Sequence, residues 1–181
     1  MLYALERIGA TATVTDNVEQ IQQADKIIFP GVGEASTAMN YLQERKLDEV
    51  IVNLRQPVLG ICLGMQLMCN YSAENDTPCL GIFKEEVKQF QGNGTGYKVP
   101  QIGWNNIYDL KTDLFRGLPG NSFCYFVHGY YAALGEHTIA TADYILPYSA
   151  GLQRDNFYGV QFHPEKSAVV GEQILKNFLG I

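Results

Sequence analysis

Residues 57–71 read PVLGICLGMQLMCNY, and this stretch sets the fold class that the sequence predicts. Residues 57–61 form a short apolar run, typical of a buried strand, and Met65–Tyr71 has the pattern of a helix behind that strand. Upstream, Lys26–Phe29 predicts another buried strand, which ends at the turn Pro30-Gly31, and residues 36–50 carry apolar side chains at helical spacing. This alternation predicts parallel strands with helices on the faces of the sheet.

The second half of the chain has a different pattern, with short strand-like runs separated by glycine, asparagine and proline. The expected strands include Phe83–Phe90, Phe123–Val127, Thr138–Ile145 and Phe157–Phe162. No repeat or linker divides the chain, so we expect a single domain over residues 1–181. The predicted fold is α/β with three layers, in which helices flank a mixed, mostly parallel sheet.

The amino-terminal segment departs from this pattern. Leu2, Leu5 and Ile8 lie at helical spacing, and Gly9 is a plausible end for that helix. A parallel α/β unit normally begins with a strand, yet nothing strand-like precedes this helix. We therefore expect the sheet to lack its first strand, as it would if the chain were truncated at the amino terminus.

The composition argues against several classes of function. Thirteen lysine and arginine residues against 19 acidic residues give a net charge of −6, so no basic excess is available for nucleic acid or an anionic membrane. The sequence has no membrane-spanning apolar stretch and no signal peptide, which predicts a cytoplasmic protein. The spacing of the cysteines predicts no disulfide framework, no metal site and no cofactor; they are Cys62, Cys69, Cys79 and Cys124.

Cys62 is the candidate nucleophile. It is the central residue of the sequence GICLG, after an apolar strand and before a helix, as in a nucleophile elbow. The two glycines allow close backbone approach, and a helix amino terminus favours the thiolate form of cysteine. The amide of Leu63 would point toward a developing oxyanion. The alternative is a buried structural cysteine, which is our interpretation of the other three cysteines.

His163 is the candidate general base. It ends an apolar run, Pro164 restricts it to an extended conformation, and Glu165 would face the same side two residues on. A carboxylate there can fix the imidazole tautomer and stabilise the imidazolium. Cys62 can meet His163 because loops at the carboxyl ends of parallel strands converge. The alternatives are a surface His-Pro-Glu turn and a role for His128 instead.

Three segments, Pro30–Gly33, Gly60–Gln66 and Gln161–Ser167, together resemble the class I (triad) glutamine amidotransferases. Within that class, Ile102–Asn105 and Tyr125–Tyr131 are similar to the glutaminase subunits of imidazole glycerol phosphate synthase. The five motifs keep their order over nearly the whole chain. The resemblance implies a flavodoxin-like fold and hydrolysis of L-glutamine to L-glutamate and ammonia, in the service of histidine biosynthesis.

The resemblance also implies a role for each catalytic residue. Cys62 would attack the side-chain amide carbon of glutamine and form a glutamyl thioester. His163 would protonate the departing ammonia and then activate water, while Glu165 would orient His163. The backbone amides of Val32 and Leu63 would form the oxyanion hole.

Further residues match positions that hold the substrate or face a partner in this family. Those expected to hold glutamine are Gly33, Gln66, His128, Gly129 and Tyr130. Trp104 and Lys166 match positions that face a (β/α)8-barrel cyclase subunit. That subunit is the expected partner, in a heterodimer, and it would receive the ammonia.

The chain departs from the family pattern at three places. The usual first strand and its Tyr-Gly-x-Gly-Asn loop are absent, Gly129 stands where serine is usual, and Gln101 stands where histidine is usual. Two alternatives within the family are a glutaminase of another pathway and an inactive remnant that only binds a partner. A cysteine hydrolase of the α/β-hydrolase type would need its acid before the histidine, whereas Glu165 follows His163.

Overall fold

The structure, a computed structural model, describes residues 1–92, 94 and 96–181. The helices are α1 (Leu2–Arg7), α2 (Val18–Gln23), α3 (Ala35–Glu44), α4 (Leu47–Val52), α5 (Leu63–Met68) and α6 (Ala168–Gly180), with 3-10 turns η1 (Asp113–Phe115) and η2 (Pro164–Lys166). The strands are β1 (Ile27–Gly31), β2 (Val58–Cys62), β3 (Tyr71–Ser72), β4 (Thr77–Pro78), β5 (Glu86–Gln89), β6 (Gln101–Ile107), β7 (Ser122–His128), β8 (Tyr130–Ala132), β9 (Thr138–Tyr144), β10 (Leu146–Arg154) and β11 (Phe157–Val160). Within these described ranges, every helix is too short or too polar to cross a membrane.

The main sheet is mixed. Its strands follow the order β1-β2-β11-β10-β8-β5-β3-β4, with β9 paired to β10, while β6 and β7 form a separate two-stranded ribbon. The pairs β1–β2, β2–β11 and β3–β5 are parallel, and the others are antiparallel. The sheet is therefore mixed as expected but less parallel than expected, because short turns in the second half of the chain can join only antiparallel neighbours.

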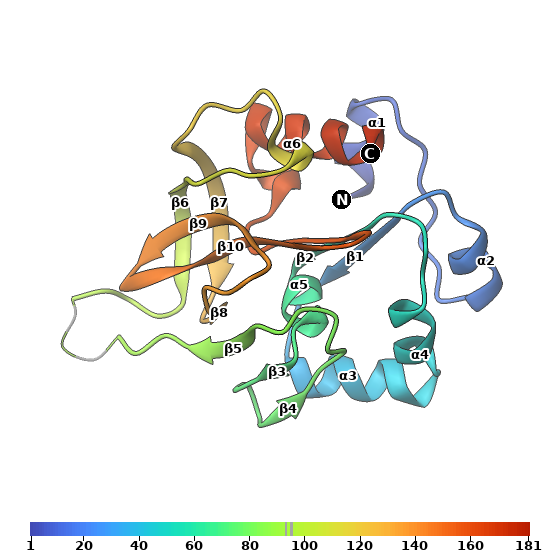
Figure 1. Ribbon diagram of the computed structural model, residues 1–181, viewed down its shortest axis with the longest axis horizontal. Coiled ribbons are helices and arrows are strands. Elements are labelled where there is room, and N and C mark those ends of the chain that lie inside the picture. Colours follow the sequence, from blue (N-terminus) through green and yellow to red (C-terminus); the bar gives the residue numbers. More distant parts are fainter. Residues whose placement is uncertain (93, 95) are drawn as a thin grey trace.

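Helices lie on both faces of the sheet, which confirms the three-layer arrangement (Figure 1). The apolar cluster on one face includes α1, α6 and the β6–β7 ribbon, and the cluster on the other face includes α3, α4 and α5. All five residues of β2 are buried, because this strand has a neighbour on each side and helices above and below it. The most deeply enclosed strand is thus the one that leads into Cys62.

The first strand of the structure, β1, lies at the edge of the sheet. Its residues are only partly buried, so the expectation of a fully buried strand over residues 26–29 is wrong. The strand also continues through Pro30 and Gly31, which were expected to form a turn. Proline is tolerated there because an edge strand needs no hydrogen-bond donor on its open side.

Several elements have other boundaries than the sequence predicts. Residues 36–50 form two helices, because Lys46 adopts a left-handed conformation (φ 55°, ψ 25°) between α3 and α4. The helix expected over Met65–Tyr71 begins directly after Cys62 and ends at Met68, so that Tyr71 lies in β3. The helix predicted near the amino terminus is confirmed as α1, with Gly9 beyond its end at φ +81°.

Gly64 lets α5 lie directly against β1, since a Cβ at this position would collide with the carbonyl oxygen of Phe29. We expect Gly64→Ala to lower the free energy of unfolding by about 1–3 kcal/mol, because backbone atoms cannot rotate out of the way. Urea unfolding followed by circular dichroism measures the change. The control is Gly120→Ala, where an added Cβ meets nothing within 4 Å, and equal stability of the two variants would contradict the prediction.

Candidate active site

Cys62 occupies a strained turn between β2 and α5. It is the last residue of the strand and the N-cap of the helix, with φ 54° and ψ −114°. Residues with a side chain rarely adopt this region. Gly60 and Gly64 make the turn possible, because a Cβ would collide with α5 at the first position and with β1 at the second. The geometry is that of a nucleophile elbow.

A cavity of about 360 Å³ opens beside Cys62, where β1 and β2 end. This is the edge at which a parallel sheet places its sites. The predicted residues that line it are Cys62, His163, Val32, Leu63, Gly33, Gln66, His128, Gly129, Tyr130 and Lys166. Glu165 contacts the cavity only through His163, and Trp104 lies on β6 with more than half of its surface exposed.

His163 lies between Cys62 and Glu165. Its Nδ1 is 3.0 Å from Glu165 Oε1, and its ring also hydrogen-bonds the side chain of Cys62. These contacts, the one with Cys62 first, raise the pKa of His163 to about 9 despite the opposing effect of burial. The structure therefore brings the three predicted catalytic side chains together, with the imidazole protonated at neutral pH.

Glu165 is ionised although it is largely buried. Burial opposes the charged form, but the hydrogen bond with His163 and further favourable contacts outweigh it and lower the pKa of Glu165. Its second oxygen, Oε2, is buried and has no hydrogen-bond partner among the residues that the structure describes. A carboxylate held in this way accepts the Nδ1 proton of His163 and fixes the tautomer of the ring.

A buried serine fixes the turn that carries His163. The hydroxyl of Ser167 donates to the carbonyl oxygen of His163 at 2.7 Å and accepts from the backbone N–H of Tyr125 at 3.0 Å. The backbone N–H of His163 donates to the carbonyl oxygen of Tyr125 at 2.9 Å. Ser167 thus ties η2 to β7. No sequence pattern marks this serine, apart from its place directly after the His-Pro-Glu-Lys run.

Gln66 is buried and shapes the wall of the cavity. Its side-chain amide donates to the carbonyl oxygen of Tyr130 and to Gln161 Oε1, both at 2.9 Å. Gln161 in turn donates to the sulfur of Cys62 at 3.7 Å. This chain of contacts connects α5, β11 and the segment 128–130 around the nucleophile.

His128, the rival candidate base, is part of a buried network. Its Nδ1 lies 2.7 Å from the carbonyl oxygen of Tyr130, and Tyr148 and Gln101 lie within 3.3 Å of its Nε2. Burial lowers the pKa of His128 to about 4. A neutral ring with both nitrogens engaged cannot serve as the base. The network also gives a place to Gln101, whose side-chain oxygen accepts from the Tyr148 hydroxyl at 3.1 Å.

The other cysteines lie outside this cavity. Burial raises the pKa of Cys79 to about 11 and that of Cys124 to about 12, and it raises the pKa of Cys69 well above the ordinary value. Their thiols therefore stay protonated at neutral pH, and a protonated thiol is a poor nucleophile. The interpretation of these three residues as structural agrees with their burial.

Glu74 is a cavity residue that the sequence did not indicate. It lies in the turn between β3 and β4 and lines the cavity. Its Oε2 accepts the backbone N–H of Ala35 at 2.8 Å, which fixes the carboxylate at the start of α3. No local pattern marks this glutamate, because only the tertiary fold carries the turn to the cavity.

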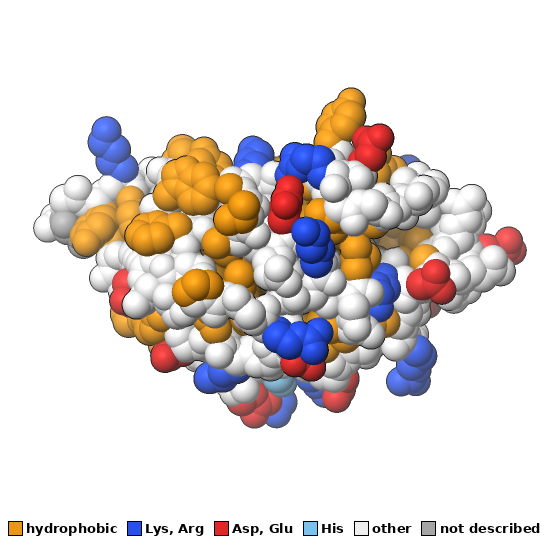
Figure 2. Space-filling view, turned by 90° about the horizontal axis from the view of Figure 1, so that it is seen from above, with side chains coloured by type: hydrophobic (Ala, Val, Ile, Leu, Met, Phe, Trp, Pro, Cys, Tyr) orange, Lys and Arg blue, Asp and Glu red, His pale blue; other side chains and the backbone are white. Residues whose placement is uncertain are grey.

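An exposed apolar surface lies on the β6–β7 ribbon, and we name it the ribbon face: Ile102, Trp104, Phe123, Tyr125 and the adjoining Lys166. Tyr125 connects the two predicted interface residues, because Trp104 packs edge-on against its ring and the Lys166 ammonium lies 5.8 Å from the ring centre. Figure 2 shows hydrophobic side chains gathered at the left of the view, the end that carries β6 and β7 in Figure 1.

The chain is similar to bacterial proteins named imidazole glycerol phosphate synthase subunit HisH. It is 56% identical to that of Bacteroides fragilis over 177 residues, which are 98% of this chain and 90% of the relative. The identity is 53% over 179 residues for Bacteroides thetaiotaomicron, covering 99% and 91% of the two chains. It is 46% over 178 residues for Haemophilus influenzae, covering 98% and 88%.

Solved structures share the fold at much lower identity. A crystal structure of a glutamine amidotransferase superposes with a TM-score of 0.72 at 20% identity, covering 98% of this chain and 89% of the other. A glutamine amidotransferase of Thermotoga maritima gives a TM-score of 0.62 at 17% identity, covering 97% and 74%. The family model of glutamine amidotransferase class-I matches residues 1–180. The chain therefore belongs to the class-I glutamine amidotransferase family.

Proposed function

We propose that this protein hydrolyses L-glutamine to L-glutamate and ammonia. The observation that carries the proposal is the position of His163 between the thiol of Cys62 and the carboxylate of Glu165, with its pKa raised to about 9. Acyl transfer needs a nucleophile, a group that moves protons and a group that orients it, and these side chains have those properties. Membership of the family supports glutamine as the substrate.

In the first half of the reaction, the sulfur of Cys62, whose proton His163 holds, attacks the side-chain amide carbon of glutamine. The carbon–nitrogen bond then breaks as His163 gives its proton to the nitrogen, which leaves as ammonia. A glutamyl thioester on Cys62 remains. In the second half, neutral His163 takes a proton from water, the oxygen attacks the thioester carbon, and the carbon–sulfur bond breaks to release glutamate.

Each half passes through a tetrahedral intermediate with a negative oxygen. The proposed donors to this oxygen are the backbone amides of Val32 and Leu63, both of which line the cavity. Leu63 is the first residue of α5, so its amide has no acceptor within the helix. One such donor is worth roughly 3–4 kcal/mol of transition-state stabilisation.

The walls of the cavity suit a small zwitterion. The carboxylate of Glu74 complements the α-ammonium group of glutamine, and the segment from His128 to Tyr130 with Gly33 and Gln66 would enclose the rest. Gly129 can contact the substrate only through its backbone, because it lacks the hydroxyl of the serine that is usual at this position in the family.

We further propose that the ammonia passes to a (β/α)8-barrel cyclase subunit in the cytoplasm, as part of histidine biosynthesis. The names of the relatives describe them as subunits of imidazole glycerol phosphate synthase, which implies a second subunit for those proteins. The ribbon face suits such a contact, because an exposed tryptophan and a neighbouring lysine are typical of interface anchors and their rims.

Alkylation tests the assignment of the nucleophile. We expect the glutamine analogue 6-diazo-5-oxo-L-norleucine to label Cys62 alone, because the raised pKa values of Cys69, Cys79 and Cys124 keep those thiols protonated. Peptide mass spectrometry identifies the labelled residue. Labelling at Cys69 or Cys124 instead would overturn the assignment.

Turnover tests the function itself. With the cyclase subunit of a relative present, Cys62→Ser is expected to reduce glutamate production at least about a thousandfold, as for other removed nucleophiles. Cys79→Ser is the matched control, since Cys79 lies outside the cavity. Equal, negligible turnover of the native chain and Cys62→Ser would favour an inactive remnant that only binds a partner.

The raised pKa of His163 predicts a particular pH dependence. Because the folded value of about 9 exceeds the ordinary value of 6.5, the stabilisation from the charged ring is complete below about pH 6.5 and is lost as the pH rises through 9. We expect NMR titration of the ring resonances to give a lower pKa in Cys62→Ser, and a smaller decrease in Glu165→Gln. An unchanged titration in both variants would refute the proposed contacts.

The ribbon face predicts which residues bind the partner. Trp104→Ala is expected to weaken binding of the cyclase subunit by about 30-fold, the effect of losing an anchor of about 2 kcal/mol. Isothermal titration calorimetry measures the dissociation constant. Tyr3→Ala provides the control, as Tyr3 is an exposed aromatic residue on α1. If both variants bind equally well, the partner lies elsewhere.

A further inference from the structure

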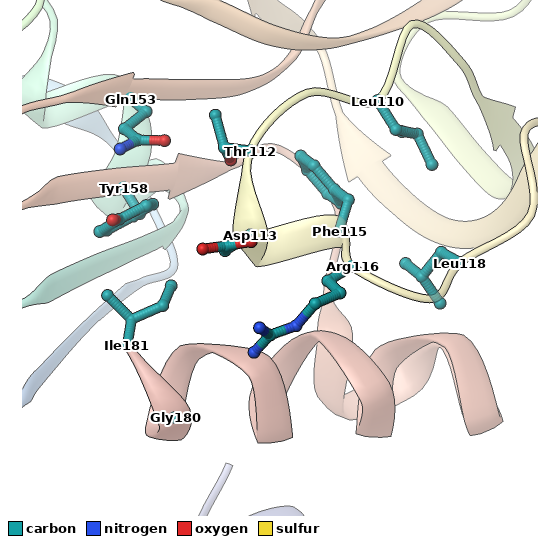
Figure 3. Close-up of a pocket in the computed structure, with 10 residues that line it drawn as sticks. All are labelled: Leu110, Thr112, Asp113, Phe115, Arg116, Leu118, Gln153, Tyr158, Gly180 and Ile181. Carbon is teal, nitrogen blue, oxygen red and sulfur yellow. The ribbon is translucent and has the colours of Figure 1, made fainter.

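A second cavity, of about 750 Å³, lies at the opposite end of the sheet from Cys62 (Figure 3). It is enclosed by η1, the end of β10, the start of β11 and the end of α6. The strand β11 runs from this cavity, at Tyr158, toward the active site, at His163. None of its lining residues lines the cavity at Cys62. Its size is in the range of small-molecule sites.

The cavity contains polar side chains without partners. Among the residues that the structure describes, Gln153 Oε1 is buried and has no hydrogen bond. The other buried side-chain atom without a hydrogen bond in these residues is Oε2 of Glu165, in the proposed catalytic trio. The nearby hydroxyl of Tyr158 also makes no hydrogen bond within the described residues, and the residue is 8% exposed. The Tyr158 hydroxyl lines the cavity and is reached by solvent, so it can hydrogen-bond a ligand there, whereas Gln153 Oε1 is closed off from the cavity.

Two opposite charges stand at the mouth of the same cavity. Asp113 and Arg116 both line it, and neither forms an ion pair or side-chain hydrogen bond with another described residue. In Figure 3 their side chains extend toward the space between Tyr158 and Ile181. Because these two side chains do not pair with each other, the carboxylate can bind the positive group of a zwitterion and the guanidinium can bind its negative group.

The turn that carries these charges is held rigidly. The side-chain amide of Asn177, on α6, donates to the carbonyl oxygens of Leu114 at 3.0 Å and Arg116 at 2.9 Å. Thr112, just before the turn, has φ 72° and ψ 163°, a conformation that costs energy in a β-branched residue. The backbone that carries Asp113 and Arg116 is therefore fixed before any ligand arrives, which reduces the entropy cost of binding.

The remaining walls are apolar. Leu110, Phe115 and Leu118 lie on one side of the cavity and Ile181 on another (Figure 3). We propose that this cavity binds a free α-amino acid with an apolar side chain. Arg116 would bind the carboxylate and Asp113 the ammonium group, while the apolar wall contacts the side chain.

The test uses L-phenylalanine as the probe and ¹H–¹⁵N NMR spectra of the full chain. We expect its addition to shift amide resonances of η1 and of the residues around Gln153 and Tyr158, with saturation. Arg116→Gln and Asp113→Asn should each weaken binding by about tenfold or more, the effect of losing one charge-assisted hydrogen bond. Both residues are exposed, so the variants should keep the native spectrum elsewhere.

Two further arms separate this site from the active site and from simple apolar binding. Cys62→Ser should bind the probe as the native chain does, whether or not Cys62 is the nucleophile. N-acetyl-L-phenylalanine and L-phenylalaninamide, which lack the ammonium and the carboxylate charge, should bind at least about tenfold more weakly than the amino acid. The absence of shifts at 10 mM L-phenylalanine, about the weakest binding of interest, would overturn the proposal. Shifts of equal size with these analogues, or in the Arg116→Gln and Asp113→Asn variants, would overturn it as well.

Discussion

The close approach of α5 to β1 and β2 is the constraint on which the site depends. Gly64 brings the helix against the Phe29 carbonyl oxygen, and Gly60 brings β2 against the same helix. Between them, Cys62 has no room to continue the strand, and it adopts φ 54°. The packing energy of an interior strand sustains this strained conformation. The sulfur consequently lies at the edge of the sheet and beside a cavity, although Cys62 itself is buried.

The parallel pairing of β2 with β11 brings His163 to the same edge of the sheet as Cys62. Ile61 is paired with Val160, so the chain leaves both strands at the same level, with Cys62 next on one strand and His163 shortly after the other. Ser167 then fixes the turn beyond β11 against β7. The opposite end of β11, together with the end of β10, borders the second cavity, so one sheet borders two separate cavities.

Two histidines beside one cavity differ in charge because their neighbours differ. His163 has a thiol and a carboxylate as partners, and its pKa rises to about 9. His128 has a carbonyl oxygen and uncharged side chains around it, and burial lowers its pKa to about 4. The same residue type is therefore charged at neutral pH in one place and neutral in the other.

Local sequence is enough to predict the strand-to-helix turn at Cys62, the His163–Glu165 pair and the α/β class, because glycine spacing, proline and apolar runs act locally on the backbone. Long-range packing sets three further features: Glu74 reaches the cavity, Ser167 holds the turn, and Lys46 divides one expected helix into two. Long-range packing also determines that β1 is only partly buried. The second cavity depends on it too, because it brings Asp113 and Gln153 together. Local patterns carry no record of such contacts, because they depend on which distant elements become neighbours.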